Sequence, residues 1–153
     1  MRQKSLIFGL AFAVFPAVSF GDAHLSCRSA DCGDITAHQR ENHVFFNEGG
    51  TRLSEAERQR LGQLSAILES HAMHDACLQL IGHADSVGEA SANRRLAQRR
   101  AEVVAQELGA KIGNPARISS VISFGEDRPM PNLSKEHAWQ RRVEIRARKC
   151  ALG

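Results

Sequence analysis

The stretch Gly82-His83-Ala84-Asp85 places a carboxylate at the end of CLQLIGHAD (77–85), a run that begins apolar and is typical of a short strand. In open α/β sheets, ligands commonly bind outside the carboxyl ends of the strands, where the next helix also presents its N-terminal N–H groups. Asp85 is therefore a candidate site residue by position. Alternatively, Asp85 or Ser86 organises the loop through hydrogen bonds from side chain to backbone.

A helix predicted over 93–108 carries a basic residue inside its apolar face. At about 100° per residue, Arg100 falls between Leu96 and Val104. A buried guanidinium is costly unless it is paired, and Asp85 is the nearest acid that the predicted topology offers. Two interpretations without a ligand stay open: a structural ion pair, and an arginine whose stem covers the core while its head reaches water.

The elements that must position these residues alternate along the chain. Strands are predicted over 43–50, 77–85, 118–126 and 141–149, and helices over 54–70 and 93–108. In the last strand, Val143, Ile145 and Ala147 alternate with Arg142, Glu144, Arg146 and Arg148, which predicts one solvated face. The β-α-β-α-β-β order favours an α+β two-layer sandwich within the α/β class, a mixed four-stranded sheet with both helices on one face.

Length and charge narrow the class of protein. The 153 residues allow one ordinary domain, expected over 44–150, behind a polar lead-in over 22–43. Once residues 1–21 are set aside, 18 Lys and Arg face 17 Asp and Glu. The chain is then nearly neutral, so we expect no nucleic acid partner.

Residues 1–21 have the pattern of a secretory signal peptide. A basic start precedes an apolar run from Leu6 to Phe20, and small residues stand at Ser19 and Gly21 near its end. We expect cleavage after Gly21 and export. A membrane anchor is the weaker alternative, because the run of 15 residues is shorter than the ~20 needed to span hydrocarbon. Lipidation of Cys27 is a further alternative that the polar residues before it disfavour.

Export places the four cysteines in an oxidising compartment, where thiols pair. Of three possible pairings, Cys27 with Cys32 closes a short local loop, which leaves Cys77 with Cys150. Cys77 opens one predicted strand and Cys150 ends another, so their bridge predicts antiparallel neighbours. A zinc site is the alternative, but Cys-x4-Cys and His71-x2-His74 match no common structural zinc pattern. We expect no metal and no cofactor.

Three separated motifs also carry a resemblance to a known family. They are Gly82-His83-Ala84-Asp85, NRRLAQRRA over 93–101 and QRRVE over 140–144. In this order they resemble the G-H-T-D, N-x-x-L-S-x-x-R-A and N-R-R-V-E patterns of the OmpA-like peptidoglycan-binding domain, found in OmpA, peptidoglycan-associated lipoprotein and MotB. The resemblance implies noncovalent, nonenzymatic binding of peptidoglycan in the periplasm. It also implies that Asp85 and Arg100 grip the diaminopimelate of the stem peptide.

The charges of Asp85 and Arg100 match those of diaminopimelate, the ligand that the resemblance implies. The free end of diaminopimelate carries an ammonium and a carboxylate, so Asp85 would accept from the first and Arg100 would bind the second. The resemblance adds Asn47, Asn93 and Arg141 as ligand-binding candidates, although Asn93 is as well explained by capping the second helix. Three departures from the family pattern, Ala84 for Thr, Ala97 for Ser and Gln140 for Asn, leave the charge pair intact.

Two other functions stay open beside a module that anchors itself or an envelope component to the wall. One is a docking module for an outer-membrane or other envelope protein, without wall binding. The other is a wall hydrolase that uses His83 and Asp85 as acid and base. The hydrolase is disfavoured, because no nucleophile motif and no metal-ligand spacing accompany these residues.

Overall fold

The computed structural model describes residues 43–150. The expected signal peptide over 1–21, the cleavage site and the Cys27–Cys32 bridge lie outside the described residues. So does the lead-in, except for its last residue, His43, which already belongs to the first strand.

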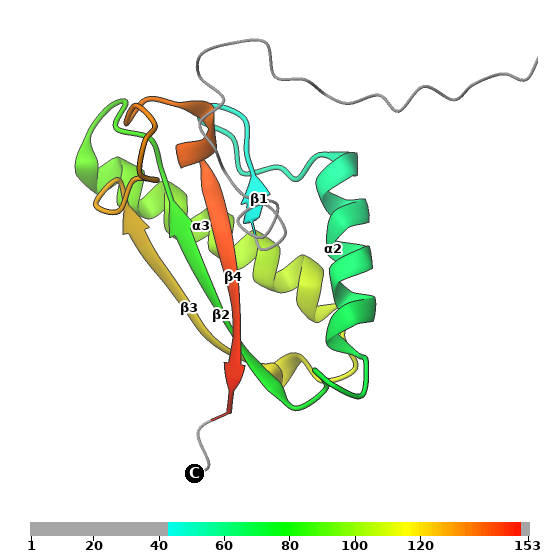
Figure 1. Cartoon of the computed structure of the whole chain (residues 1–153). Helices are drawn as coiled ribbons and strands as arrows, with labels where there is room; N and C mark the ends of the chain where they lie inside the picture. The colour runs from blue at the N-terminus through cyan, green and yellow to red at the C-terminus, as the bar shows by residue number, and fades with distance from the viewer. Residues whose placement is uncertain (1–42, 151–153) are drawn as a thin grey trace, which may run out of the picture.

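The described chain folds as a mixed sheet covered by helices. Its strands are β1 (His43–Phe45), β2 (Ala76–His83), β3 (Ile118–Gly125) and β4 (Arg142–Lys149), and its helices are α2 (Glu55–Leu68) and α3 (Ala90–Gly109). The strand order is β1-β4-β2-β3, with β2 and β3 parallel and β4 antiparallel to both β1 and β2. Both helices lie on the same side of the sheet (Figure 1). The predicted two-layer architecture is confirmed.

Apolar residues at the predicted periods build the core between the two layers. Leu61 and Leu68 of α2, Val104 and Leu108 of α3, and Leu78, Leu80, Val143 and Ile145 of the sheet are all buried. The first helix begins as its capping box predicts, because the Ser54 hydroxyl accepts from the Glu57 N–H at 3.2 Å. The second helix begins three residues earlier than predicted, with Glu89 at the cap position.

The alternation in β4 predicts each of its two faces only in part. Val143 and Ile145 are buried, whereas Arg142, expected in solvent, is only 5% exposed. Its guanidinium donates to Gln140 Oε1 and to the Arg128 carbonyl, because the segment between β3 and β4 folds over this end of the sheet. Burial lowers the pKa of Arg142 to about 10. Ala147, expected in the core, is exposed.

Two close contacts fix β2 against its neighbours. A Cβ at Gly82 would lie 2.0 Å from the Ala97 carbonyl oxygen, so only glycine lets α3 approach the strand this closely. At the other end of β2, Cys77 and Cys150 form the predicted disulfide, with Cα atoms 4.8 Å apart. The antiparallel pairing of β2 with β4 confirms what that bridge implied.

Within residues 43–150, no helix has the length and apolar character to cross a membrane.

Candidate functional site

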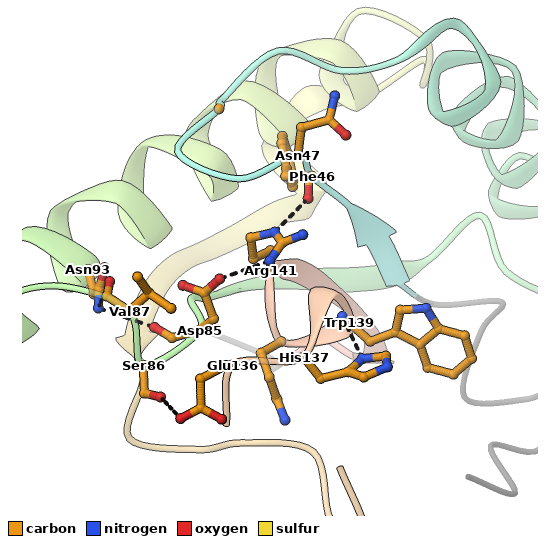
Figure 2. Close-up of polar contacts among 12 residues, drawn as sticks. Phe46, Asn47, Asp85, Ser86, Val87, Asn93, Glu136, His137, Trp139 and Arg141 are labelled. Atoms are coloured by element: carbon orange, nitrogen blue, oxygen red, sulfur yellow. Dashed lines mark hydrogen bonds and ion pairs between the residues drawn. The ribbon is translucent and has the colours of Figure 1, made fainter. Parts of the chain in front are cut away.

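The site forms where the carboxyl end of β2 meets the amino end of β4. Antiparallel pairing of these strands brings Asp85, two residues after β2, beside Arg141, one residue before β4. Arg141 Nη1 donates to Asp85 Oδ2 at 2.9 Å, and Arg141 Nε donates to the Phe46 carbonyl at 3.2 Å (Figure 2). Asp85 is 6% exposed. Two of the predicted site residues thus form a direct ion pair.

Asn93 holds the loop that carries Asp85. It is the fourth residue of α3, so the helix-capping interpretation is wrong. Its buried amide donates to the main-chain carbonyls of Asp85 and Val87, both at 3.1 Å, and to Glu126 Oε2 at 2.7 Å. Asn93 is therefore a positioning residue for the 85–87 loop.

Arg100 does not form the expected pair with Asp85 in an open hollow. It is fully buried, and it donates from Nε to the Gly50 carbonyl at 2.8 Å and from Nη2 to the Asn47 carbonyl at 3.1 Å. The turn after β1, with Gly49 at φ +60°, presents these carbonyls to α3. The guanidinium also lies 5.4 Å from the centre of the Phe46 ring. Arg100 therefore holds the 47–50 turn in place beside the site.

The charge of Arg100 is nevertheless coupled to the pair in front of it. Burial lowers the pKa of Arg100 to about 10, Asp85 opposes this shift and Arg141 adds to it. Arg100 stays protonated at neutral pH, so two guanidinium groups act on the one carboxylate of Asp85. Arg100 Nη1 is buried and makes no hydrogen bond within the described residues. The side of the site that holds the Arg100 and Arg141 guanidinium groups therefore favours the binding of a further anionic group.

Acidic side chains that the sequence motifs did not predict lie on the other side of Asp85. Glu126 accepts from Asn93, and Glu136 accepts from the Ser86 hydroxyl at 3.0 Å. Ser86 was predicted only as a loop organiser, and its N–H also donates to the Lys135 carbonyl. These carboxylates come from the segment between β3 and β4, whose fold no periodicity indicates. The site therefore has an acidic side and a basic side.

Asn47 contributes its backbone rather than its amide. Its carbonyl accepts from Arg100 and from the Gly50 N–H. Its side chain is exposed and points away from the Asp85–Arg141 pair in Figure 2. The structure therefore does not bring the Asn47 amide to the other candidates.

His83 is not paired with Asp85 among the contacts of the described residues. It is 2% exposed, and its ring packs against Phe124 at 6.0 Å between centroids. Its nearest acid is Glu144, with Nε2 and Oε2 3.7 Å apart. Burial lowers the pKa of His83, whereas His83 and the Arg146 guanidinium lower that of Glu144 to about 2. The arrangement that the hydrolase alternative requires is absent among the described residues.

The buried histidines of this sheet face make stability depend on pH. Burial, and secondarily Arg142, lowers the pKa of His43 to about 4, from 6.5 when unfolded. Between these values the unfolded chain binds more protons, so stability falls as the pH falls. We expect the free energy of unfolding to drop by roughly 1–2 kcal/mol from pH 7.5 to pH 5, measured by urea denaturation. His43→Gln should flatten this dependence, and an unchanged slope would contradict it.

Comparison with known proteins places this geometry in a family. Residues 45–142 match the model of the OmpA family. The chain belongs to the OmpA family. Among curated proteins, it is 41% identical over 69 residues to outer membrane porin F of Pseudomonas fluorescens, covering 44% of this chain and 21% of the relative. It is 30% identical over 105 residues to outer membrane protein A of Shimwellia blattae, covering 69% and 43%. The chain thus spans less than half of these relatives' lengths.

Solved structures of OmpA-like domains share the fold. The peptidoglycan-associated lipoprotein of Burkholderia pseudomallei aligns with a TM-score of 0.60 at 22% identity, over 76% of this chain and 98% of that one. The periplasmic domain of Helicobacter pylori MotB aligns with a TM-score of 0.59 at 22% identity, over 71% of both chains. At 22% identity, these alignments show that the chain shares the fold of the OmpA-like domains.

Proposed function

We propose that the protein is exported to the periplasm and binds peptidoglycan noncovalently through the diaminopimelate of the stem peptide. In this way it anchors itself, or an outer-membrane or other envelope component, to the wall. The observation that carries the proposal is the Asp85–Arg141 ion pair of 2.9 Å. It lies where the first and third sequence motifs meet, and Arg100 of the second motif lies behind it. The solved relatives support the proposal, because one is by name a peptidoglycan-associated lipoprotein.

The ligand's two charges match the two sides of the site. In the bound state, the ammonium of diaminopimelate donates to Asp85, and its carboxylate accepts from Arg141. Arg141 is the more accessible guanidinium, with 16% of its side chain exposed, whereas Arg100 is sealed. On binding, Arg141 gives up its hydrogen bond to Asp85 and donates to the ligand carboxylate. It keeps its hydrogen bond to the Phe46 carbonyl. Arg100 contributes its charge and the position of the 47–50 turn.

One observation favours the second candidate function, a docking module for an envelope protein without wall binding. Asp85 already has a guanidinium partner and is largely buried, which is also what a purely structural ion pair looks like. In that case the pair would hold β1, β2 and β4 together while another surface binds the partner. The two functions predict opposite results with isolated cell wall.

Co-sedimentation with purified sacculi tests the proposed function. We expect the chain to pellet with sacculi whose stem peptides contain diaminopimelate, and to be released by soluble peptides of the same type. Sacculi with lysine at that position are the matched control, because lysine keeps the ammonium and lacks the second carboxylate. Retention on them should be reduced about 10-fold or more, the value of one lost charge-assisted contact. Equal retention on both would refute diaminopimelate recognition, and retention on neither would favour the docking module.

A further inference from the structure

A hollow adjoins the Asp85–Arg141 pair, and Arg141 belongs to both. It has a volume of about 350 Å³, and its lining includes Phe45, Trp139, Asn47, Arg52 and Arg141. Arg141 therefore faces both the ion pair and this hollow. In Figure 2, Arg141 lies between Asp85 and Trp139. A ligand whose charged end reaches Asp85 therefore has its neighbouring groups within reach of this hollow.

Two aromatic rings form the apolar part of the hollow. Phe45 and Trp139 have ring centroids 5.9 Å apart and are tilted by 41°. His137 helps to position Trp139, because its ring meets the indole edge-on at 5.7 Å and its Nδ1 accepts from the main-chain N–H of Trp139 at 3.1 Å. Both Phe45 and Trp139 are half-buried. They offer a positioned aromatic surface beside a charged site.

Polar groups border these rings. The amide of Asn47 and the guanidinium of Arg52 are exposed, and Ser54 and Glu57 complete the border where α2 begins. Ligand sites typically combine aromatic surface with a few such groups, in volumes of about 300–1,000 Å³. A pyranose ring presents C–H groups on one face and hydroxyl and acetamido groups at its edge. Aromatic surface bordered by amide, guanidinium and carboxylate matches that chemistry.

We infer that this hollow is a saccharide subsite, in which Trp139 and Phe45 contact an N-acetylated sugar of the glycan strand. The inference rests on the proposed function, because in peptidoglycan the stem peptide is attached to that strand. The Asp85–Arg141 pair then binds the peptide while the aromatic hollow binds the adjoining sugar. A single chain would in this way recognise the junction between peptide and glycan.

Two soluble probes separate the inference from the proposed function. The first is the diaminopimelate stem peptide alone, and the second is the same peptide on its N-acetylglucosaminyl-N-acetylmuramyl disaccharide. Calorimetry on the full chain should show about 3- to 10-fold tighter binding of the second probe, as expected for one aromatic contact. Because Trp139 is the single tryptophan of the sequence, its fluorescence should change with the second probe and not with the first.

Substitutions at Trp139 complete the test. Trp139→Ala should remove the advantage of the disaccharide and leave the affinity for the peptide alone unchanged, and Trp139→Phe should retain most of the advantage. No advantage of the disaccharide in the parent chain, or an equal loss for both probes in Trp139→Ala, would overturn the inference. Failure to bind the peptide, with disaccharide binding that still depends on Trp139, would overturn the proposed function and leave the saccharide subsite standing.

Discussion

Replacing Asp85 with asparagine is expected to weaken binding of the diaminopimelate stem peptide about 10- to 100-fold, because hydrogen bonds to charged groups contribute about 1.5–3 kcal/mol. The amide keeps the shape of the side chain but loses the negative charge that receives the ammonium. The main-chain carbonyl of Asp85 still accepts from Asn93, so the 85–87 loop keeps its anchor. Calorimetry with the stem peptide measures the effect, and far-UV circular dichroism should show an unchanged fold.

A matched control for this substitution is available on the surface. Asp127 also pairs with an arginine, Arg94, but both side chains are more than half exposed. Asp127→Asn should therefore change the affinity for the stem peptide less than 2-fold, because exposed pairs contribute little and this one lies outside the site. Full affinity in Asp85→Asn, or an equal loss in Asp127→Asn, would show that Asp85 does not receive the ligand.

Arg100 is a poorer position for such a test, although the motif it belongs to marks it as a ligand residue. Its removal would take the Arg100 donor from the Gly50 carbonyl, and the Asn47 carbonyl would keep only the Gly50 N–H. Buried acceptors that lose a partner are destabilising, so a loss of binding would be mixed with a loss of structure. Arg141→Gln changes a more accessible side chain and reports on the carboxylate contact more directly.

The contrast between Arg100 and its partners shows what the sequence can predict about this site. The helical period places Arg100 in the apolar stripe of α3, and the structure confirms its burial. Its acceptors, however, are main-chain carbonyls in the turn after β1, and every residue type carries such a carbonyl. Composition and spacing therefore suggest an acidic partner, Asp85, whereas the fold supplies two carbonyls.

The sheet also shows that a local sequence pattern predicts which side chains share a face, but not which segments cover that face. Period-two alternation identifies Val143 and Ile145 as core residues of β4, because the pleat alone decides which side chains share a face. It does not tell what covers the opposite face. The buried Gln140 there accepts from the Met130 N–H at 2.7 Å and receives the Arg142 guanidinium. The turn-rich segment before β4 has no period, so the burial of Arg142 was not predictable from it.

The largest effect on stability is expected from the Cys77–Cys150 disulfide. The bridge spans 73 residues of sequence, and a loop of that size restricts the unfolded chain by about 4 kcal/mol at 25 °C in the chain-entropy model. Among the described strands, β1 pairs with β4 only as far as Glu144, so the rest of β4 is held by β2 and by this bridge. The double variant Cys77→Ser/Cys150→Ser should lower the free energy of unfolding by that amount in urea denaturation.

The position of the bridge makes this loss of stability separable from binding. Cys77 lies near the start of β2, whereas Asp85 follows its end, so the folded double variant should bind the stem peptide with the affinity of the parent chain. The double variant is a better test than a reducing agent, which acts on every disulfide of the chain. A decrease in unfolding free energy below about 1 kcal/mol would contradict the chain-entropy argument. A loss of affinity in the folded variant would show that the far end of β2 is coupled to the site.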